Sequence, residues 1–158
     1  MRKLALLLAL AALSVPVSAA ADGTSVVSAF GCIASGGHVT RPAGTDIVVR
    51  FGWIAKTPGL VQDYLQAQAS TLAVNDGPTV DVSGTYGAPI AVGADWGAFA
   101  FYDTGVVLAP GQSMTFATSV TVSHRLTDGI VTASDANDKP AFGGPGALFA
   151  GTCTVTGV

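Results

Sequence analysis

The clearest pattern in the chain is an alternation of apolar and polar residues from Ser113 to Arg125, where apolar side chains fall on one face and Thr and Ser side chains on the other. The segment 46–56 repeats the pattern, and its inward face would carry Ile47, Val49, Phe51 and Trp53. A period of two is typical of a strand that buries one face. We therefore expect two half-buried antiparallel strands, with Trp53 in the core.

Shorter strands are predicted where apolar runs are separated by turn-forming residues. Their expected ranges are 70–74, 79–83, 88–92, 96–102 and 106–108, and the turns between them include 75–78 and 103–105. Near the two ends of the domain, Val26, Phe30 and Cys32 share a period-two phase, as do Ala147, Phe149, Cys153 and Val155. This phase predicts a first and a last strand whose cysteines face the core.

One short helix is expected after Thr57. Thr57 can cap it, Pro58 suits its first turn, and apolar residues from Leu60 to Leu65 fall on one side. A helix this short serves as a crossover between sheets. About eight short strands with one crossover helix predict an all-β fold, an antiparallel β-sandwich, with a jelly roll or a small barrel as the alternative.

The N-terminus has the pattern of a secretory signal peptide. Arg2 and Lys3 precede the apolar run Leu4–Leu13, and small residues follow at 18–20. The run has about ten residues, whereas a membrane-spanning helix needs about 20. We therefore expect residues 1–20 to be removed, which leaves 21–158 as one exported domain, secreted or at the cell surface, with no membrane span.

Composition and charge restrict the classes of partner. Hydrophobic residues make up 49% of the chain and charged residues 11%, a balance that excludes a disordered tail. Without residues 1–20, five basic residues stand against ten aspartates, a net charge of −5. Such a surface offers no electrostatic footprint for nucleic acid or anionic lipid. The expected partner is an extracellular protein or a glycan, and the sequence specifies neither its identity nor the oligomeric state.

Cys32 and Cys153 are the only cysteines of the chain. In an oxidising compartment, two cysteines in one small domain form a disulfide, and neither lies in a CxxC motif. The bridge would close a loop of 121 residues and tie the first strand to the last. A reactive thiol or a metal ligand is the alternative.

These features together resemble the immunoglobulin-like domains of secreted bacterial proteins. The resemblance rests on Trp53 in an early central strand, cysteines in buried phase, and the long alternating strand from Ser113. Immunoglobulin domains proper carry their cysteines on two interior strands, whereas here they fall on the terminal strands. The resemblance implies an immunoglobulin-like sandwich over 21–158 and no particular activity.

Catalytic chemistry has few candidates in this sequence. The chain has no Glu, its only histidines are His38 and His124, and it contains no Gly-x-Ser-x-Gly elbow. We interpret His38 as a loop residue and His124 as a strand-end histidine on an apolar face. The pattern favours a non-enzymatic structural or interaction module that needs no cofactor. An exported hydrolase with a dispersed triad that includes His124 is the enzymatic alternative.

Two features favour a ligand-binding sandwich as a further alternative. The string 135–142 resembles the calcium-binding linker of cadherins, which implies calcium ligands at Asp135, Asn137 and Asp138. A solvated surface loop is the other interpretation of this string. Trp96 and Tyr86, which both adjoin glycine-containing turns, are the candidates for a surface on which a glycan would stack.

Overall fold

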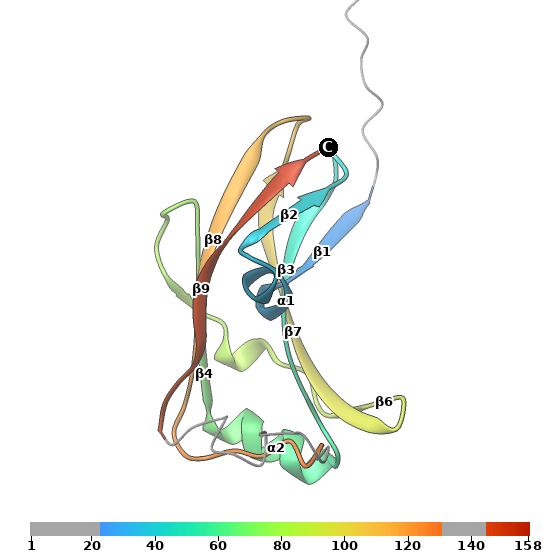
Figure 1. Ribbon diagram of the computed structural model, residues 1–158, viewed down its shortest axis with the longest axis vertical. Helices are drawn as coiled ribbons and strands as arrows, with labels where there is room; N and C mark the ends of the chain where they lie inside the picture. Colours follow the sequence, from blue (N-terminus) through green and yellow to red (C-terminus); the bar gives the residue numbers. More distant parts are fainter. Residues whose placement is uncertain (1–22, 131–144) are drawn as a thin grey trace, which may run out of the picture.

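A computed structural model describes residues 23–130 and 145–158 of the chain (Figure 1). Within these residues, nine strands form two sheets, one of four strands in the order β1-β3-β7-β6 and one of five in the order β2-β9-β8-β4-β5. The fold class is therefore all-β, and the two sheets are consistent with the predicted β-sandwich. The ranges 96–102 and 106–108, predicted as two strands, form one strand, and the strand at His38–Arg41 was not predicted.

The four-stranded sheet is built on two long strands, β3 (Asp46–Ala55) and β7 (Asp95–Val107), which pair antiparallel. β6 (Ile90–Val92) pairs antiparallel with β7. β1 (Thr24–Ser28) pairs with β3 in parallel, with its five residues opposite 46–50. β3 buries Ile47, Val49 and Phe51 and turns Trp53 to the same side, as the alternation predicts.

The five-stranded sheet is built on β8 (Ser113–Val122) and β9 (Gly146–Gly157), which pair antiparallel. β4 (Gln68–Val74) continues the sheet beyond β8, and β5 (Val80–Asp81) forms its edge. At the other edge, β2 (His38–Arg41) pairs with β9 in parallel.

Each sheet thus contains one parallel pair, and the expectation of a purely antiparallel sandwich is wrong in this respect. Figure 1 shows the reason: β1 runs down along one sheet, the chain turns, and β2 runs back up along the other. Because β3 then runs down again, β1 and β3 have the same direction. The first part of the chain therefore covers an edge of both sheets.

The first predicted strand is wrong beyond Ser28. A short helix, α1 (Ala29–Ala34), begins there, and the Ser28 side chain accepts a hydrogen bond from the N–H of Gly31. Ala29 and Cys32 are buried because residues three apart share a helix face, whereas Phe30 is 62% exposed. Val26, Phe30 and Cys32 share a period-two phase, but Val26 and Phe30 are exposed and only Cys32 is buried.

The predicted crossover helix is confirmed as α2 (Pro58–Ala67). Thr57 is its N-cap and accepts a hydrogen bond from the N–H of Leu60 at 3.4 Å. The helix leads from β3 in one sheet to β4 in the other and buries Val61 and Tyr64. A 3₁₀ turn, η1 (Ser83–Thr85), lies between β5 and β6, where the chain returns to the first sheet.

The sequence predicts a turn at 103–105, but β7 continues through these residues. The Asp103 carboxylate accepts a hydrogen bond from the N–H of Gly105, which has a φ of 65°. The pairing of β3 with β7 shifts register between Asp46 and Val48, next to this point. The turn-forming residues therefore make a β-bulge inside a long strand and not a chain reversal.

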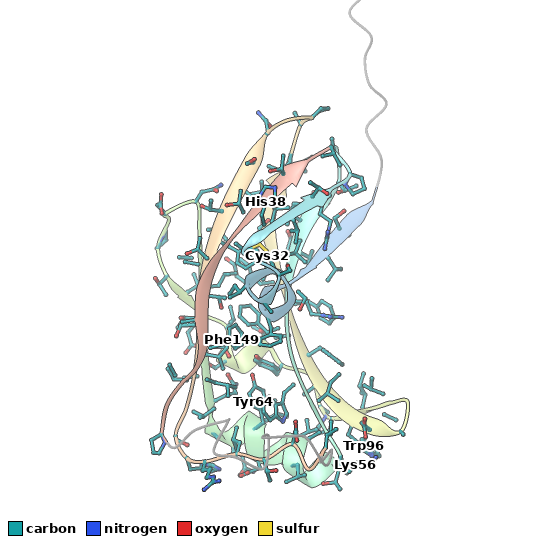
Figure 2. The ribbon with its side chains drawn as sticks, in the orientation of Figure 1. Cys32, His38, Lys56, Tyr64, Trp96 and Phe149 are labelled. Carbon is teal, nitrogen blue, oxygen red and sulfur yellow. A yellow bond between two sulfur atoms is a disulfide. The ribbon has the colours of Figure 1, made fainter. Side chains whose placement is uncertain are left out.

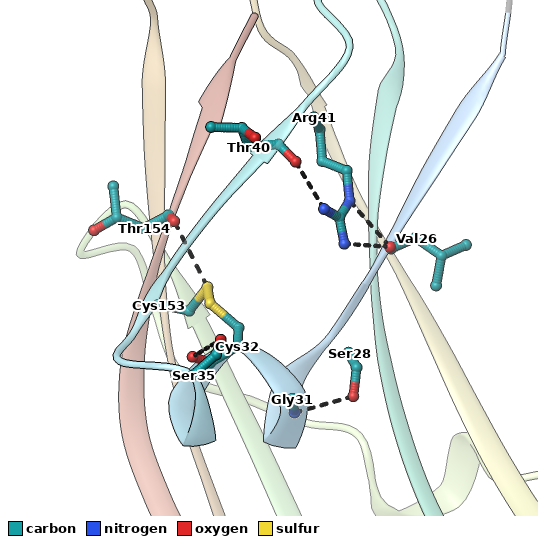
Figure 3. Close-up of a disulfide and its surroundings, with 9 residues drawn as sticks. All are labelled: Val26, Ser28, Gly31, Cys32, Ser35, Thr40, Arg41, Cys153 and Thr154. Atoms are coloured by element: carbon teal, nitrogen blue, oxygen red, sulfur yellow. Dashed lines mark hydrogen bonds between the residues drawn. A yellow bond between two sulfur atoms is a disulfide. The ribbon is translucent and has the colours of Figure 1, made fainter.

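The predicted disulfide between Cys32 and Cys153 is confirmed (Figure 3). The two Cα atoms are 6.0 Å apart, and the bridge joins α1 to β9, so the prediction that it starts from the first strand is wrong. Near it, the Arg41 guanidinium on β2 donates two hydrogen bonds to the carbonyl of Val26 on β1, at 3.1 and 3.3 Å. A covalent link and a polar link thus connect the two sheets on the same side.

The sheets lie close together at the end that carries the C-terminus and diverge toward α2, which crosses the other end (Figure 1). The core between them includes buried side chains from both sheets and both helices, among them Val27, Val49, Phe51, Tyr64, Leu72, Met114, Phe116, Val120 and Val155. No helix in the described part of the chain is long and apolar enough to cross a membrane.

Candidate functional site

A groove of about 480 Å³ lies where the two sheets diverge. This volume is in the range of cavities that hold small ligands. We call it the aromatic groove, because six of the eleven residues that line it are aromatic. They are Ser28, Phe30, Arg50, Phe51, Gly52, Trp53, Ile54, Tyr64, Phe99, Leu148 and Phe149.

The inner wall of the groove is formed by rings from both sheets and both helices. Trp53 on β3 stacks on Tyr64 of α2, with ring centroids 4.9 Å apart and planes 7° from parallel. Phe149 on β9 packs edge-on against Phe30 of α1, with centroids 5.7 Å apart. Figure 2 shows Tyr64 and Phe149 in the space between the sheets. The inner wall is therefore apolar and contains no carboxylate.

The outer wall comes from the opposite face of β3. Successive side chains of a strand point to opposite faces, so Arg50 and Ile54 lie on the other side of β3 from Phe51 and Trp53. The Arg50 guanidinium lies 5.5 Å from the ring centroid of Phe99 on β7, at a distance typical of a cation–π contact. A groove that touches both faces of one strand must pass over the edge of that strand.

That edge of β3 is open along half of its length. The pairing of β1 with β3 ends at Ser28 opposite Arg50, and no other described strand pairs with Phe51–Ala55 on that side. The neighbouring edge of β9 is similar, because β2 pairs only with its last residues, from Thr154 onward. Two unpaired strand edges therefore flank the mouth of the aromatic groove.

A hydrogen-bonded chain of hydroxyl groups lies behind the inner wall. The Tyr64 and Tyr86 hydroxyls are 2.8 Å apart, and the Tyr86 hydroxyl is 3.2 Å from that of Ser70. Ser70 in turn donates to the side-chain carbonyl of Gln68 at 2.6 Å. Burial raises the pKa of both Tyr64 and Tyr86 above the usual value, so both phenols are protonated at neutral pH.

Trp96 and Tyr86, the residues predicted to stack on a ligand, are half-buried and pack against the same small cluster of Ala55, Val61 and Ala98. The Tyr86 hydroxyl points inward to Tyr64, and neither residue lines the aromatic groove. Trp96 lies beside Lys56, at the end of the molecule that carries α2 (Figure 2). Ligand binding by these two residues stays a prediction.

The two histidines lie on the surface. His38 is the first residue of β2, so its predicted loop position is wrong. His124 follows β8, and the prediction that it lies on an apolar face is also wrong, because it is exposed. Its Nε2 is 2.9 Å from the Asp63 carboxylate, and its Nδ1 is 3.2 Å from the Ser123 hydroxyl. None of these three residues lines the aromatic groove, and the His124 and Asp63 side chains are 48% and 42% exposed.

The predicted calcium ligands, Asp135, Asn137 and Asp138, lie outside the described residues, and calcium binding there stays a prediction. Within 23–130 and 145–158, no group of three or more His, Cys, Asp or Glu side chains is placed to hold a metal ion.

The sequence did not predict a groove, although its alternation placed Phe30, Phe51, Trp53 and Phe149 on core-facing sides. Phe30 and Phe149 come together only because α1 interrupts the first predicted strand, and Phe99 joins them only through the pairing of Gly52 with Phe99. The one available signal was the row of aromatic residues at 51, 53 and 64, which the period-two and helical patterns assign to the core.

No protein-family model, no curated protein and no solved structure matches this chain. What the chain does must therefore follow from the geometry of the aromatic groove.

Proposed function

We propose that the chain is an exported, non-enzymatic, immunoglobulin-like binding module that holds an apolar group of its partner in the aromatic groove. The observation that carries the proposal is the convergence of Trp53, Tyr64 and Phe149, from both sheets and α2, on one open space. Protein interiors normally close around such rings, so an accessible space between them favours a binding role.

The mouth of the groove supports the proposal. Phe30 is 62% exposed and Ile54 is 40% exposed, and both line the same groove. Single apolar residues on a surface are ordinary, but a contiguous apolar patch around a cavity is typical of an interaction site. Binding of an apolar group there would bury these side chains together with the inner rings.

The chemistry of the groove favours binding over catalysis. Its titratable side chains are those of Arg50 and Tyr64. The guanidinium of an arginine has no acceptor atom, and burial raises the pKa of Tyr64 further above neutral. Neither side chain can therefore act as a general base or a nucleophile at neutral pH.

Export is supported by two observations. The first residues have the pattern of a secretory signal, and the disulfide between Cys32 and Cys153 is of a kind that persists in oxidising compartments. The bridge also closes a long part of the chain, which suits a domain that works outside the cell.

The proposal is tested with Nile red, an uncharged dye whose emission rises in apolar surroundings. We expect saturable binding to the chain without residues 1–20. In a Trp96→Phe background Trp53 is the only tryptophan, and we expect the dye to quench its emission.

Matched variants then locate the site. Leu148→Arg places a charge in the groove and should weaken dye binding at least about tenfold, whereas Ile90→Arg, on an exposed isoleucine of β6 outside the groove, should leave it unchanged. Phe30→Ser changes an exposed ring at the mouth and tests the same point with little risk to folding. Equal dye binding by all three variants, or none by the parent chain, would contradict the proposal.

A further inference from the structure

We propose that the occupant of the aromatic groove is an extended peptide segment of a partner protein, which adds as a strand to the open edge of β3 at Phe51–Ala55. This inference rests on the proposed function, because it names the partner of the same groove. It makes the domain a receptor for a strand, with main-chain hydrogen bonds to β3 and side-chain contacts on both faces.

The first observation is the course of the groove along β3. Five consecutive residues of this strand, 50–54, line it, and they alternate between the two faces of the sheet. A closed pocket between sheets would take its lining from inward-facing residues only. Because consecutive residues on both faces line it, this groove follows the edge of the strand. An added strand would fill a groove of this shape.

The second observation is where β1 stops. β1 lies beside 46–50, and the chain then leaves the sheet as α1. The position next to Phe51–Ala55 therefore has no strand in the described part of the chain, and five residues at about 3.3 Å each extend over about 17 Å. In a strand with one neighbour, alternate N–H and C=O groups point away from that neighbour, where a second strand can pair with them.

The third observation is that this edge lacks the features that normally prevent strand addition. Edge strands are commonly very short, or carry charged residues or Pro. β5 has two residues, β6 has three, and β2 carries Arg41. By contrast, Phe51–Ala55 contains neither a charged residue nor a proline. An apolar edge without charged residues or proline, beside an apolar groove, is what a strand-binding site requires.

The two faces of the groove specify the side chains of the peptide. Those that point inward would contact Trp53, Tyr64 and Phe149 and should be apolar. Those that point outward would lie near Arg50 and Phe99. Among the described residues no carboxylate forms an ion pair with Arg50, so an acidic side chain of the peptide is the complementary partner on this face.

The peptide used to test this inference is a heptapeptide with both ends blocked. It has valine at positions 1, 3, 5 and 7, threonine at positions 2 and 6, and aspartate at position 4. We expect it to displace Nile red from the chain and to slow amide hydrogen exchange within Phe51–Ala55. Replacing the central aspartate with lysine should weaken binding about threefold to fivefold, which is the effect expected from the loss of one surface ion pair. Arg50→Gln should remove this difference between the two peptides.

Two controls separate strand pairing from apolar contact. A peptide with the same side chains and N-methyl groups on all backbone nitrogens cannot donate main-chain hydrogen bonds, and it should bind at least about tenfold more weakly. Ile54→Lys adds a charge to the open edge and should weaken peptide binding. Ile90→Lys, the matched change on the three-residue edge strand β6, should not.

The outcomes distinguish this inference from the function on which it rests. If Nile red binds but the heptapeptide neither displaces it nor slows exchange in β3, the strand proposal is wrong and an apolar groove remains. If the N-methylated peptide binds as well as the parent peptide, strand pairing is likewise wrong. A stable dimer of the chain that Ile54→Lys dissociates would make a second copy the occupant and would overturn the proposal. If neither dye nor peptide binds, the proposed function is wrong as well.

Discussion

The two ends of the sandwich differ in what holds the sheets together. Toward the C-terminal end, the sheets are joined by the disulfide and by the hydrogen bonds of Arg41 to Val26, and side chains such as Val155 are fully buried. Toward the other end, the sheets diverge and α2 spans them (Figure 1). There the inward rings of Trp53 and Phe149 line the aromatic groove. We call these the closed end and the open end.

The comparison shows how a small domain can keep apolar side chains accessible and still fold. A domain of this size depends on a limited core, and every ring left in a groove contributes less to stability than a fully buried one. A covalent link at the closed end compensates by restricting the unfolded chain. The predictions below test whether the two ends respond differently to matched changes.

The largest difference is expected when a charge is placed at each end of β9. Val155→Asp puts an unpaired carboxylate in a fully buried position and should abolish folding, a loss above about 4 kcal/mol in the free energy of unfolding. Leu148→Asp puts the same group into the groove, where it reaches water, and should cost about 1 to 2 kcal/mol. Urea unfolding followed by circular dichroism measures both. Equal losses would mean that the open end is as tightly packed as the closed end.

Removal of the disulfide should have the next largest effect. The Cys32→Ala/Cys153→Ala double variant should lose about 2 to 5 kcal/mol of unfolding free energy, because the bridge closes a loop of 121 residues. Reductant should lower the melting temperature of the parent chain and leave that of the double variant unchanged. If complete reduction left the melting temperature of the parent chain unchanged, the disulfide would not stabilise the closed end.

How much of this could be predicted from the sequence differs between the two ends. The cysteine pair, the inward face of β8 and the capped helix α2 follow from residue types and simple periods, and all are confirmed. These features depend on local geometry or on the redox chemistry of two residues. The disulfide of the closed end was therefore predictable, and so was the helix α2 that spans the open end.

The groove at the open end was not predictable, because it depends on register and on one helix. The six-residue helix α1 is short enough for its residues to be taken as a strand, and it decides where β1 stops. The Asp103–Gly105 bulge likewise fits either a turn or a long strand. No single segment encodes the pairing that leaves Phe51–Ala55 uncovered, so the groove could not be found from periodicity.

The hydrogen-bonded pair of Tyr64 and Tyr86 predicts a specific loss of stability in alkali. Burial raises the pKa of Tyr64 and Tyr86 in the folded chain above the value of about 10 in the unfolded chain. Above pH 10 the unfolded state therefore binds fewer protons, and the unfolding free energy should fall by up to about 1.4 kcal/mol per pH unit for each tyrosine. Below pH 10 this contribution should be constant.

The control for this prediction is the Tyr64→Phe/Tyr86→Phe double variant. It should lose about 1 kcal/mol at neutral pH, since it removes the hydrogen bond between the two hydroxyls, and it should show a flatter decline from pH 10 to 11.5. The same slope in the parent and the double variant would show that other groups cause the alkaline transition.

The smallest effect is expected at the surface of the open end. His124→Ala and Asp63→Asn each remove one side of an exposed contact between the two side chains, and each should change the unfolding free energy by less than about 0.5 kcal/mol. Neither variant should alter the binding of Nile red, because neither residue lines the groove. If His124→Ala abolished a measurable hydrolysis of simple esters by the parent chain, the enzymatic alternative would replace the binding module.

The central claim is that β3 is covered along 46–50 and open along 51–55, and residue-resolved amide hydrogen exchange of the free chain tests it most directly. The account predicts uniformly slow exchange where β1 pairs with β3, followed by alternating slow and fast amides from Phe51 to Ala55. Uniformly slow exchange through Ala55 would show that this edge is already covered in the free chain, and would contradict both the open groove and the strand that we propose for it.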